Sequence, residues 1–179
     1  SGYLVLKDFH REKNSMFGFY SRILTVDLSR REFFVEPLSD EFLNACLGGK
    51  GLATRLLLDR NPASVDPLSP QNHLIIATGP FCQSRLWGAS RYGVYTKSPL
   101  TGFYAESYSG GRVPEAIDSV GYDAVLFVGR STTPAVVSIH PEGAEFHDAG
   151  DLWGTDAITA EQESVNRFSP NGEGFSKSG

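Results

Sequence analysis

The hydrophobic and polar positions near the start of the chain predict a β-hairpin. Residues 19–28 alternate with a period of two, which places Ile23 and Thr25 on one face and Leu24 and Val26 on the other. A short charged turn and a second apolar stretch follow at once. We therefore expect a half-buried strand that pairs with its successor in a hairpin.

The pattern then changes to helical spacing and predicts two helices. Ser39 caps the first, and Gly48-Gly49 ends it. The apolar face of this helix comprises Phe42, Leu43, Cys46 and Leu47. A second helix is expected over residues 50–60.

Lys50 stands at the start of the second predicted helix, where a cation is electrostatically disfavoured unless an anion is near. Two interpretations remain open. The helix start holds a phosphate or a carboxylate, or Lys50 is a solvated surface residue. The surrounding Gly-Gly-Lys-Gly does not have the spacing of a Walker A motif.

Three short apolar stretches in the middle of the chain predict three strands. They begin at Leu74, Tyr92 and Phe103 and end in turns rich in Gly, Pro and Ser. The loop of residues 61–72, which precedes them, contains three prolines and is expected to be a stiff connector.

The remainder of the chain predicts further short elements. They are a helix over 113–120, a central strand over 123–128, strands over 135–139 and 144–147 that continue a meander, a turn anchored by Trp153, and a helix over 155–168 capped by Thr155. The whole pattern indicates an α+β fold, a mostly antiparallel strand meander with several short helices.

Candidate binding chemistry gathers in the turns between the central strands. Arg91 and Lys97 lie beside backbone rich in glycine and hydroxyl side chains. Bare amides and a fixed cation are the groups that proteins use to hold phosphate. The alternative is a solvated turn with surface charges.

Composition narrows the class of protein. The chain has 179 residues, which suits one domain, and its formal net charge of −5 argues against nucleic acid as the main partner. No apolar run approaches the roughly 20 residues of a membrane helix, so no membrane partner is expected. The first residues show no secretory pattern, which predicts a cytoplasmic protein.

The cysteines, histidines and aspartates of the chain do not have the sequence spacing of a metal-binding site. Cys46 and Cys82 are isolated, without a C-x-x-C pair, and are expected to be small buried residues. The histidines lack metal-ligand spacing; they are His10, His73, His140 and His147. Four aspartates form no carboxylate pair that the sequence places; they are Asp118, Asp123, Asp148 and Asp151.

A series of short motifs spans most of the chain. In order they are Phe17-Gly18, Arg22-Ile23-Leu24-Thr25-Val26-Asp27-Leu28, Leu47-Gly48-Gly49-Lys50-Gly51-Leu52-Ala53, Asp66-Pro67-Leu68-Ser69-Pro70-Gln71-Asn72, Thr78-Gly79-Pro80, Thr96-Lys97-Ser98-Pro99-Leu100-Thr101-Gly102, Ser109-Gly110-Gly111, Gly121-Tyr122-Asp123-Ala124 and Leu152-Trp153-Gly154. In order and spacing they resemble the N-terminal domain of the aldehyde:ferredoxin oxidoreductase family, the tungsten- or molybdenum-bis-pterin enzymes. The resemblance implies a domain over residues 16–168, with 1–15 a leader or tag-derived extension and 169–179 a flexible tail.

The resemblance also implies a cofactor site. In that family this domain holds the phosphates of a pterin that carries tungsten or molybdenum, together with a magnesium ion. Arg91 falls at a pterin-contacting arginine, and Tyr108 falls where the family has an asparagine whose backbone carbonyl meets the magnesium. The cofactor-binding residues expected here are Arg91, Lys97, Tyr108, Ser109, Gly110 and Gly111.

The implied whole enzyme oxidises an aldehyde to a carboxylic acid and passes electrons to ferredoxin. The cysteine ligands of its 4Fe–4S cluster and its catalytic groups are not encoded in this chain, so the chain alone is expected to be inactive and to need the remaining domains or subunits. The alternative is a short, non-catalytic relative that binds an anionic ligand or a partner subunit. Tyr108 favours this alternative, as does Trp87, which either fills the pterin's space or stacks on the pterin.

Overall fold

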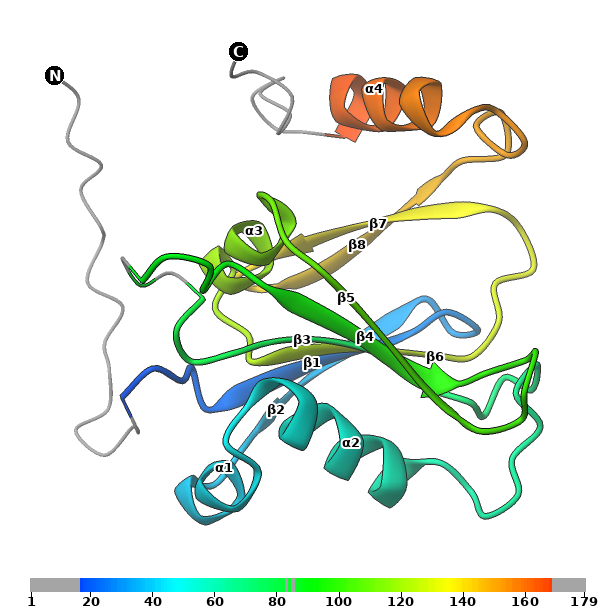
Figure 1. Cartoon of the computed structure of the whole chain (residues 1–179). Coiled ribbons are helices and arrows are strands. Elements are labelled where there is room, and N and C mark those ends of the chain that lie inside the picture. Colours follow the sequence, from blue (N-terminus) through cyan, green and yellow to red (C-terminus); the bar gives the residue numbers. More distant parts are fainter. Residues whose placement is uncertain (1–16, 83, 85, 169–179) are drawn as a thin grey trace, which may run out of the picture.

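The computed structural model describes residues 17–82, 84 and 86–168. The leader expected over residues 1–15 and the tail expected over residues 169–179 lie outside the described residues. Figure 1 shows the described part as stacked layers around one twisted sheet. This arrangement confirms the predicted α+β class.

The central sheet has six strands in the order β2-β1-β6-β3-β4-β5. Their bounds are β1 Arg22–Asp27, β2 Glu32–Pro37, β3 Leu74–Thr78, β4 Tyr92–Lys97, β5 Tyr104–Ser109 and β6 Ala124–Val128. All neighbouring pairs are antiparallel except β1 and β6, which run parallel. The predicted hairpin and the three central strands are confirmed, and β6 lies in the middle of the sheet as expected.

The last two strands, β7 Ala135–His140 and β8 Gly143–Asp148, pair only with each other among the described residues. The expectation that they continue a meander from β6 is therefore wrong, because β6 pairs with β1 and β3 instead. Figure 1 shows this hairpin stacked on one face of the sheet, with α3 Val113–Ser119 near it, while α1 Asp40–Cys46 and α2 Gly49–Arg60 cover the other face.

Because both faces of the sheet are covered, β1 is buried on both sides. Ile23 points into the core under α2, and Leu24 and Val26 point into the core under the hairpin. All three are fully buried. The predicted alternation of faces is confirmed, but the expectation of a half-buried strand is wrong, since the β7–β8 hairpin covers the face that was expected to meet solvent.

The predicted cap of α1 is confirmed. The Ser39 hydroxyl accepts a hydrogen bond from the backbone N–H of Phe42, with 3.2 Å between the two atoms. Leu47, however, does not belong to the apolar face: it takes a left-handed conformation with φ 56° at the end of the helix and is 75% exposed. The helix thus ends at Cys46 and is capped by Leu47, so the glycines that were expected to end it belong to the start of α2 instead.

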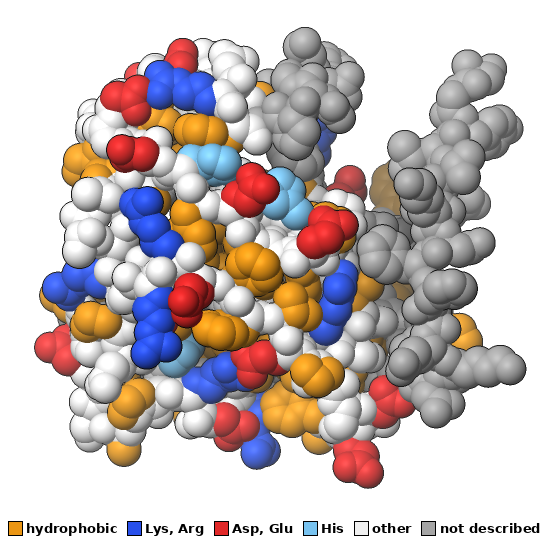
Figure 2. Space-filling model, turned by 180° about the vertical axis from the view of Figure 1, so that it is seen from behind, with side chains coloured by type: hydrophobic (Ala, Val, Ile, Leu, Met, Phe, Trp, Pro, Cys, Tyr) orange, Lys and Arg blue, Asp and Glu red, His pale blue; other side chains and the backbone are white. Residues whose placement is uncertain are grey.

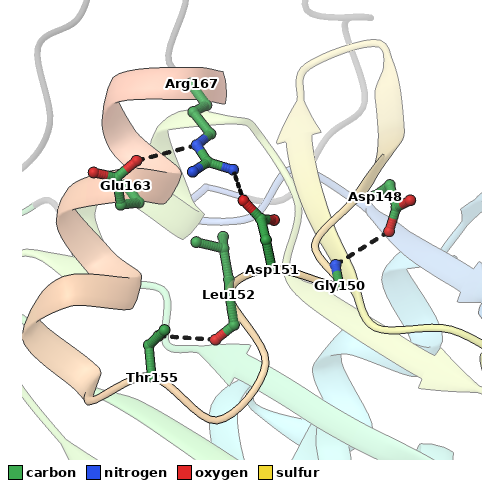
Figure 3. A network of polar contacts seen from close by, with 7 residues as sticks. All are labelled: Asp148, Gly150, Asp151, Leu152, Thr155, Glu163 and Arg167. Carbon is green, nitrogen blue, oxygen red and sulfur yellow. Dashed lines mark hydrogen bonds and ion pairs between the residues drawn. The ribbon is translucent and has the colours of Figure 1, made fainter.

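The C-terminal helix α4, Ala157–Phe168, differs from prediction at its start. Asp156 caps it, because its carboxylate accepts the N–H groups of Ile158 and Thr159, both at 3.0 Å. Thr155 instead donates its hydroxyl to the Leu152 carbonyl of the preceding turn (Figure 3). The anchor of that turn is also different, since Leu152 is buried and Trp153 is exposed.

The surface carries both signs of charge. On the face seen in Figure 2, lysine and arginine side chains are interspersed with acidic and apolar ones. Within the described ranges, the helices are too short or too polar to cross a bilayer.

Candidate functional site: a pocket beside Arg91

A pocket of about 420 Å³ lies where β3 ends and β4 begins. Its wall is formed by the start of α2, by the turn after β3, by the loop that leads to β4, and by the facing residues of β4 and β5. The charged, thiol and aromatic side chains that line the pocket and are discussed below are Lys50, Cys82, Trp87, Arg91, Tyr95 and Tyr108.

Strand pairing brings Arg91 to the glycine turn predicted to bind the cofactor. Tyr92 pairs with Ser109 across β4 and β5. A Cβ added to Gly110 would lie 3.6 Å from the Arg91 Cδ atom and 3.2 Å from the Ser90 carbonyl, so glycine allows this close approach. The Ser90 hydroxyl donates to the Gly111 carbonyl at 2.8 Å. Arg91 is exposed, and its guanidinium has no hydrogen-bond or ion-pair partner among the residues that the structure describes.

Five of the six predicted cofactor residues therefore lie together, namely Arg91, Tyr108, Ser109, Gly110 and Gly111. Lys97 lies at the other end of β4, and its ammonium donates to the Val65 carbonyl. There the Asn72 amide donates to the carbonyls of Pro67 and Lys97, at 2.9 and 3.1 Å. The motifs of residues 66–72 and 96–102 thus contact each other, away from the pocket.

Tyrosines form the inner wall of the pocket. Tyr95 is almost fully buried, and its ring meets that of Tyr108 edge-on, with 6.0 Å between ring centroids. Burial, and then the hydrogen bond with Tyr108, raises the pKa of the Tyr95 phenol well above its usual range. The Tyr95 oxygen lies only 2.2 Å from where a Cβ on Gly93 would be, so Gly93 leaves the space that this phenol occupies.

Of the two alternatives that the sequence left open for Lys50, the solvated lysine with a free side chain is wrong, because its ammonium is paired with a carboxylate of the chain itself. Its ammonium lies 2.8 Å from a carboxylate oxygen of Glu106 on β5. The hydroxyl of Tyr104 donates to the other oxygen of Glu106 at 3.1 Å. These contacts raise the pKa of Lys50 and lower the pKa of Glu106, in each case mainly through their mutual hydrogen bond.

Trp87 does not fill the pocket. Its side chain is fully exposed at the pocket's lip. Phe81 and Leu86, which also line the pocket, are exposed as well. Of the two roles considered for Trp87, occupation of the ligand's space is therefore inconsistent with the structure, and stacking on a ligand stays a prediction.

Behind the pocket, the structure reveals a carboxylate pair that the sequence did not place. Tyr20 joins the two acids, because its hydroxyl donates to Asp118 at 3.2 Å and its backbone N–H donates to Asp123 at 3.0 Å. Both carboxylates are buried, and burial raises the pKa of Asp118 and raises the pKa of Asp123 to about 6. The backbone N–H of Tyr20, and then that of Arg22 at 3.2 Å, partly offset the rise in the pKa of Asp123.

Cys82 lines the pocket and lies near enough to Asp118 to be affected by its charge. Burial, followed by the nearby charge of Asp118, raises the pKa of its thiol to about 11. Cys82 is thus a buried neutral thiol, as expected from the sequence. Cys46 is also a free thiol but is only partly buried, so the expectation of burial is wrong for it. In the described part of the chain, no group of three or more His, Cys, Asp or Glu side chains could hold a metal ion.

Sequence reasoning missed the partner of Lys50 and the acid pair. A local signal existed for part of the pocket wall, since Tyr104, Glu106 and Tyr108 recur with a period of two and so share one face of a strand. No local signal existed for contacts between Tyr20 and two acids about a hundred residues away.

Comparison with known proteins identifies the chain's relatives. A family model described as "Aldehyde ferredoxin oxidoreductase, N-terminal domain" matches residues 23–175. A tungsten-containing aldehyde ferredoxin oxidoreductase of Pyrococcus furiosus is 37% identical over 172 residues, which covers 90% of this chain and 28% of that protein. The Thermococcus kodakarensis protein of the same name is 40% identical over 139 residues, 78% of this chain and 23% of the relative.

A solved structure agrees with these matches. The active-site complex BamBC of benzoyl coenzyme A reductase, in complex with 1,5-dienoyl-CoA, superposes with a TM-score of 0.79 at 32% identity, covering 84% of this chain and 23% of that chain. The chain thus spans about a quarter of the length of these relatives. From the family match and these identities, the chain belongs to the aldehyde ferredoxin oxidoreductase family, a family of oxidoreductases, and corresponds to its N-terminal domain.

Proposed function

We propose that this chain is the metallopterin-binding platform of an enzyme that oxidises aldehydes to carboxylic acids with ferredoxin as electron acceptor. The observation that carries the proposal is the guanidinium of Arg91, which has no partner among the described residues and packs against Gly110 at the edge of the pocket. The tungsten in the names of the relatives supports tungsten as the metal, with molybdenum as the alternative.

The residues present fit an anionic, partly aromatic cofactor. The pocket volume of about 420 Å³ lies within the range of small-molecule sites. Arg91 would bind a phosphate group, the backbone of Ser109, Gly110 and Gly111 would line the approach to it, and the carbonyl of Tyr108 would face the magnesium ion. When bound, the metal on the pterin supplies the redox chemistry, and the protein binds and orients the cofactor. Lys97 lies away from the pocket, at the other end of β4. Its role in binding the cofactor therefore stays a prediction.

The proposal includes further parts of the enzyme that cover the pocket. The apolar side chains of Phe81, Leu86 and Trp87 are exposed around its opening. Exposed apolar groups that gather at one place mark surfaces where proteins make contacts. We assign the remaining catalytic groups, the iron–sulfur cluster and the contact with ferredoxin to those other parts, with residues 16–168 as the platform and the cytoplasm as the location.

Cofactor content tests this proposal. The chain would be purified without oxygen from cells supplied with tungstate and molybdate, and its pterin and metal measured. We expect close to stoichiometric pterin, a large loss in Arg91→Ala, and no loss in Arg30→Ala, which removes an exposed arginine on the β1–β2 turn. A folded chain without pterin would contradict the proposal that this domain alone holds the cofactor.

A second function, a non-catalytic module that binds an anionic ligand or a partner subunit, has one observation in its favour. A tyrosine ring, Tyr108, stands at the pocket wall where the resemblance leads one to expect a small amide side chain. Absence of pterin, together with binding of a phosphate compound that depends on Arg91, would favour this function.

A further inference from the structure

We propose that Lys50 is a second anion-binding cation of the pocket and that Glu106 controls its availability. This inference rests on the proposed function, because it assumes that the pocket takes an anionic ligand. It adds the charge class of that ligand: a group with two or more negative charges, such as a phosphate monoester or a pyrophosphate, engages both cations. A ligand with one negative charge engages Arg91 alone.

The two cations belong to one cavity although they come from distant parts of the chain. Lys50 lies in the first turn of α2 and Arg91 immediately precedes β4, yet both line the same pocket. Arg91 has no partner among the described residues, whereas Lys50 is paired with Glu106. Of these two cations, Arg91 is therefore available to a ligand in the free protein and Lys50 is neutralised by Glu106.

The pair is placed so that Lys50 can exchange partners. The Lys50 side chain is 59% exposed, so solvent and a ligand reach its ammonium. An exposed ion pair of this kind contributes little to stability, and separating it costs correspondingly little. A doubly charged phosphate near Arg91 offers the ammonium a stronger partner than the single charge of Glu106.

Glu106 does not lose all its contacts when Lys50 leaves. Tyr104 donates its hydroxyl to one carboxylate oxygen at 3.1 Å, and a hydrogen bond from Tyr108 also lowers the pKa of Glu106. Tyr104 is held in turn by Thr54 of α2, with 2.8 Å between their hydroxyl oxygens. The carboxylate thus stays fixed beside the pocket and competes with any incoming anion for Lys50.

A purely structural role makes a different prediction. A cation in the first turn of a helix is electrostatically disfavoured, so Glu106 could serve only to neutralise Lys50 and stabilise the start of α2. In that case, loss of Glu106 lowers the melting temperature and leaves anion binding unchanged. Binding measurements therefore separate the two roles.

The test is a titration of the full 179-residue chain with inorganic pyrophosphate at low salt, followed by calorimetry. Glu106→Gln removes the competing charge and frees Lys50, so it should bind pyrophosphate roughly two- to fivefold more tightly than wild type. Lys50→Met leaves Glu106 unpaired near the ligand and should bind more weakly by a similar factor. The double variant lacks both the cation and the carboxylate that competes for it, so it should bind more tightly than Lys50→Met and more weakly than Glu106→Gln.

Arg91→Ala separates failure of this inference from failure of the proposed function. If Arg91→Ala abolishes binding but Glu106→Gln and Lys50→Met leave it unchanged, the inference is overturned and the anion pocket stands. If no variant alters binding, or if pyrophosphate does not bind, both are overturned. Melting temperatures of all variants establish that each is folded, and inorganic phosphate at the same salt concentration serves as the less charged probe.

Discussion

At the scale of single residues, Asp123 shows how one side chain joins distant segments. Its buried carboxylate accepts the backbone N–H groups of Tyr20 and Arg22 and so fixes the start of β1 beside the start of β6. Burial raises its pKa to about 6 from the ordinary value of 3.8. The folded state therefore binds a proton at Asp123 more tightly than the unfolded state does.

This proton linkage gives a prediction. The contribution of Asp123 to the free energy of unfolding is fully present below pH 4 and is lost as the pH rises through about 6. Between pH 4.5 and 7.5 the expected loss is about 2 kcal/mol. Asp123→Asn lacks this titration and turns an amide N–H₂ toward a backbone N–H, so it should be less stable than wild type by about 1–3 kcal/mol, with the larger deficit at pH 4.5.

Urea unfolding at several pH values measures both effects. Glu142→Gln is the matched control, because it makes the same acid-to-amide change at an exposed position. An identical pH dependence in Asp123→Asn and wild type would contradict the assigned titration.

At the scale of secondary-structure elements, α4 is the helix most dependent on polar contacts. None of its residues is buried. Figure 3 shows Arg167 between Glu163, one turn earlier on the same helix, and Asp151 in the turn that precedes it. Phe168 adds a stacked contact with His147 of β8, with 4.4 Å between ring centroids.

Arg167→Ala should therefore loosen α4 without unfolding the rest of the domain. Backbone amides of α4 should exchange with deuterium about two- to fivefold faster, since exposed ion pairs contribute about 0.2–1 kcal/mol. Arg55→Ala is the control: it removes a similar ion pair with Asp59, but from α2, whose apolar side chains are packed on the sheet. Equal loosening of both helices would contradict this explanation of α4.

Local patterns predicted most of these elements, because periodicity and caps are properties of neighbouring residues. The β1–β2 hairpin, the cap of α1 and the central position of β6 all follow from such signals. Burial of β1 on both faces could not be predicted in this way, because it depends on a hairpin more than a hundred residues further along the chain. At the site, Arg91 and Gly110 could be predicted as cofactor-binding residues from the sequence. The pairing of Lys50 with Glu106 could not be predicted, because it depends on tertiary packing.

At the scale of the whole molecule, the two cores share the same strands. Leu126 of β6 is buried under α2, and Val26 of β1 is buried under the β7–β8 hairpin. Because β1 and β6 are neighbours in the sheet, side chains of both strands alternate between the two cores. Damage to one core therefore disturbs the strands that form the other.

We expect Leu126→Ala and Val26→Ala each to lower the free energy of unfolding of the entire domain, by about 2–5 kcal/mol for the leucine and somewhat less for the valine. Each should unfold in a single transition. Circular dichroism during urea unfolding measures the stability, and deuterium exchange in α2 and β8 tests whether both sides respond together. Exposed Leu58→Ala is the control. If Val26→Ala speeds deuterium exchange in the β7–β8 hairpin but not in α2, the claim that the two cores are coupled through shared strands is contradicted.

The exposure of both tryptophans has a practical consequence. Trp87 and Trp153 already meet water in the folded chain, so their fluorescence should change little when the domain unfolds. Trp87, at the lip of the pocket, is instead placed to report on whatever occupies or covers that opening. With Trp153 replaced by phenylalanine, the chain would carry a single built-in optical sensor of its own binding site.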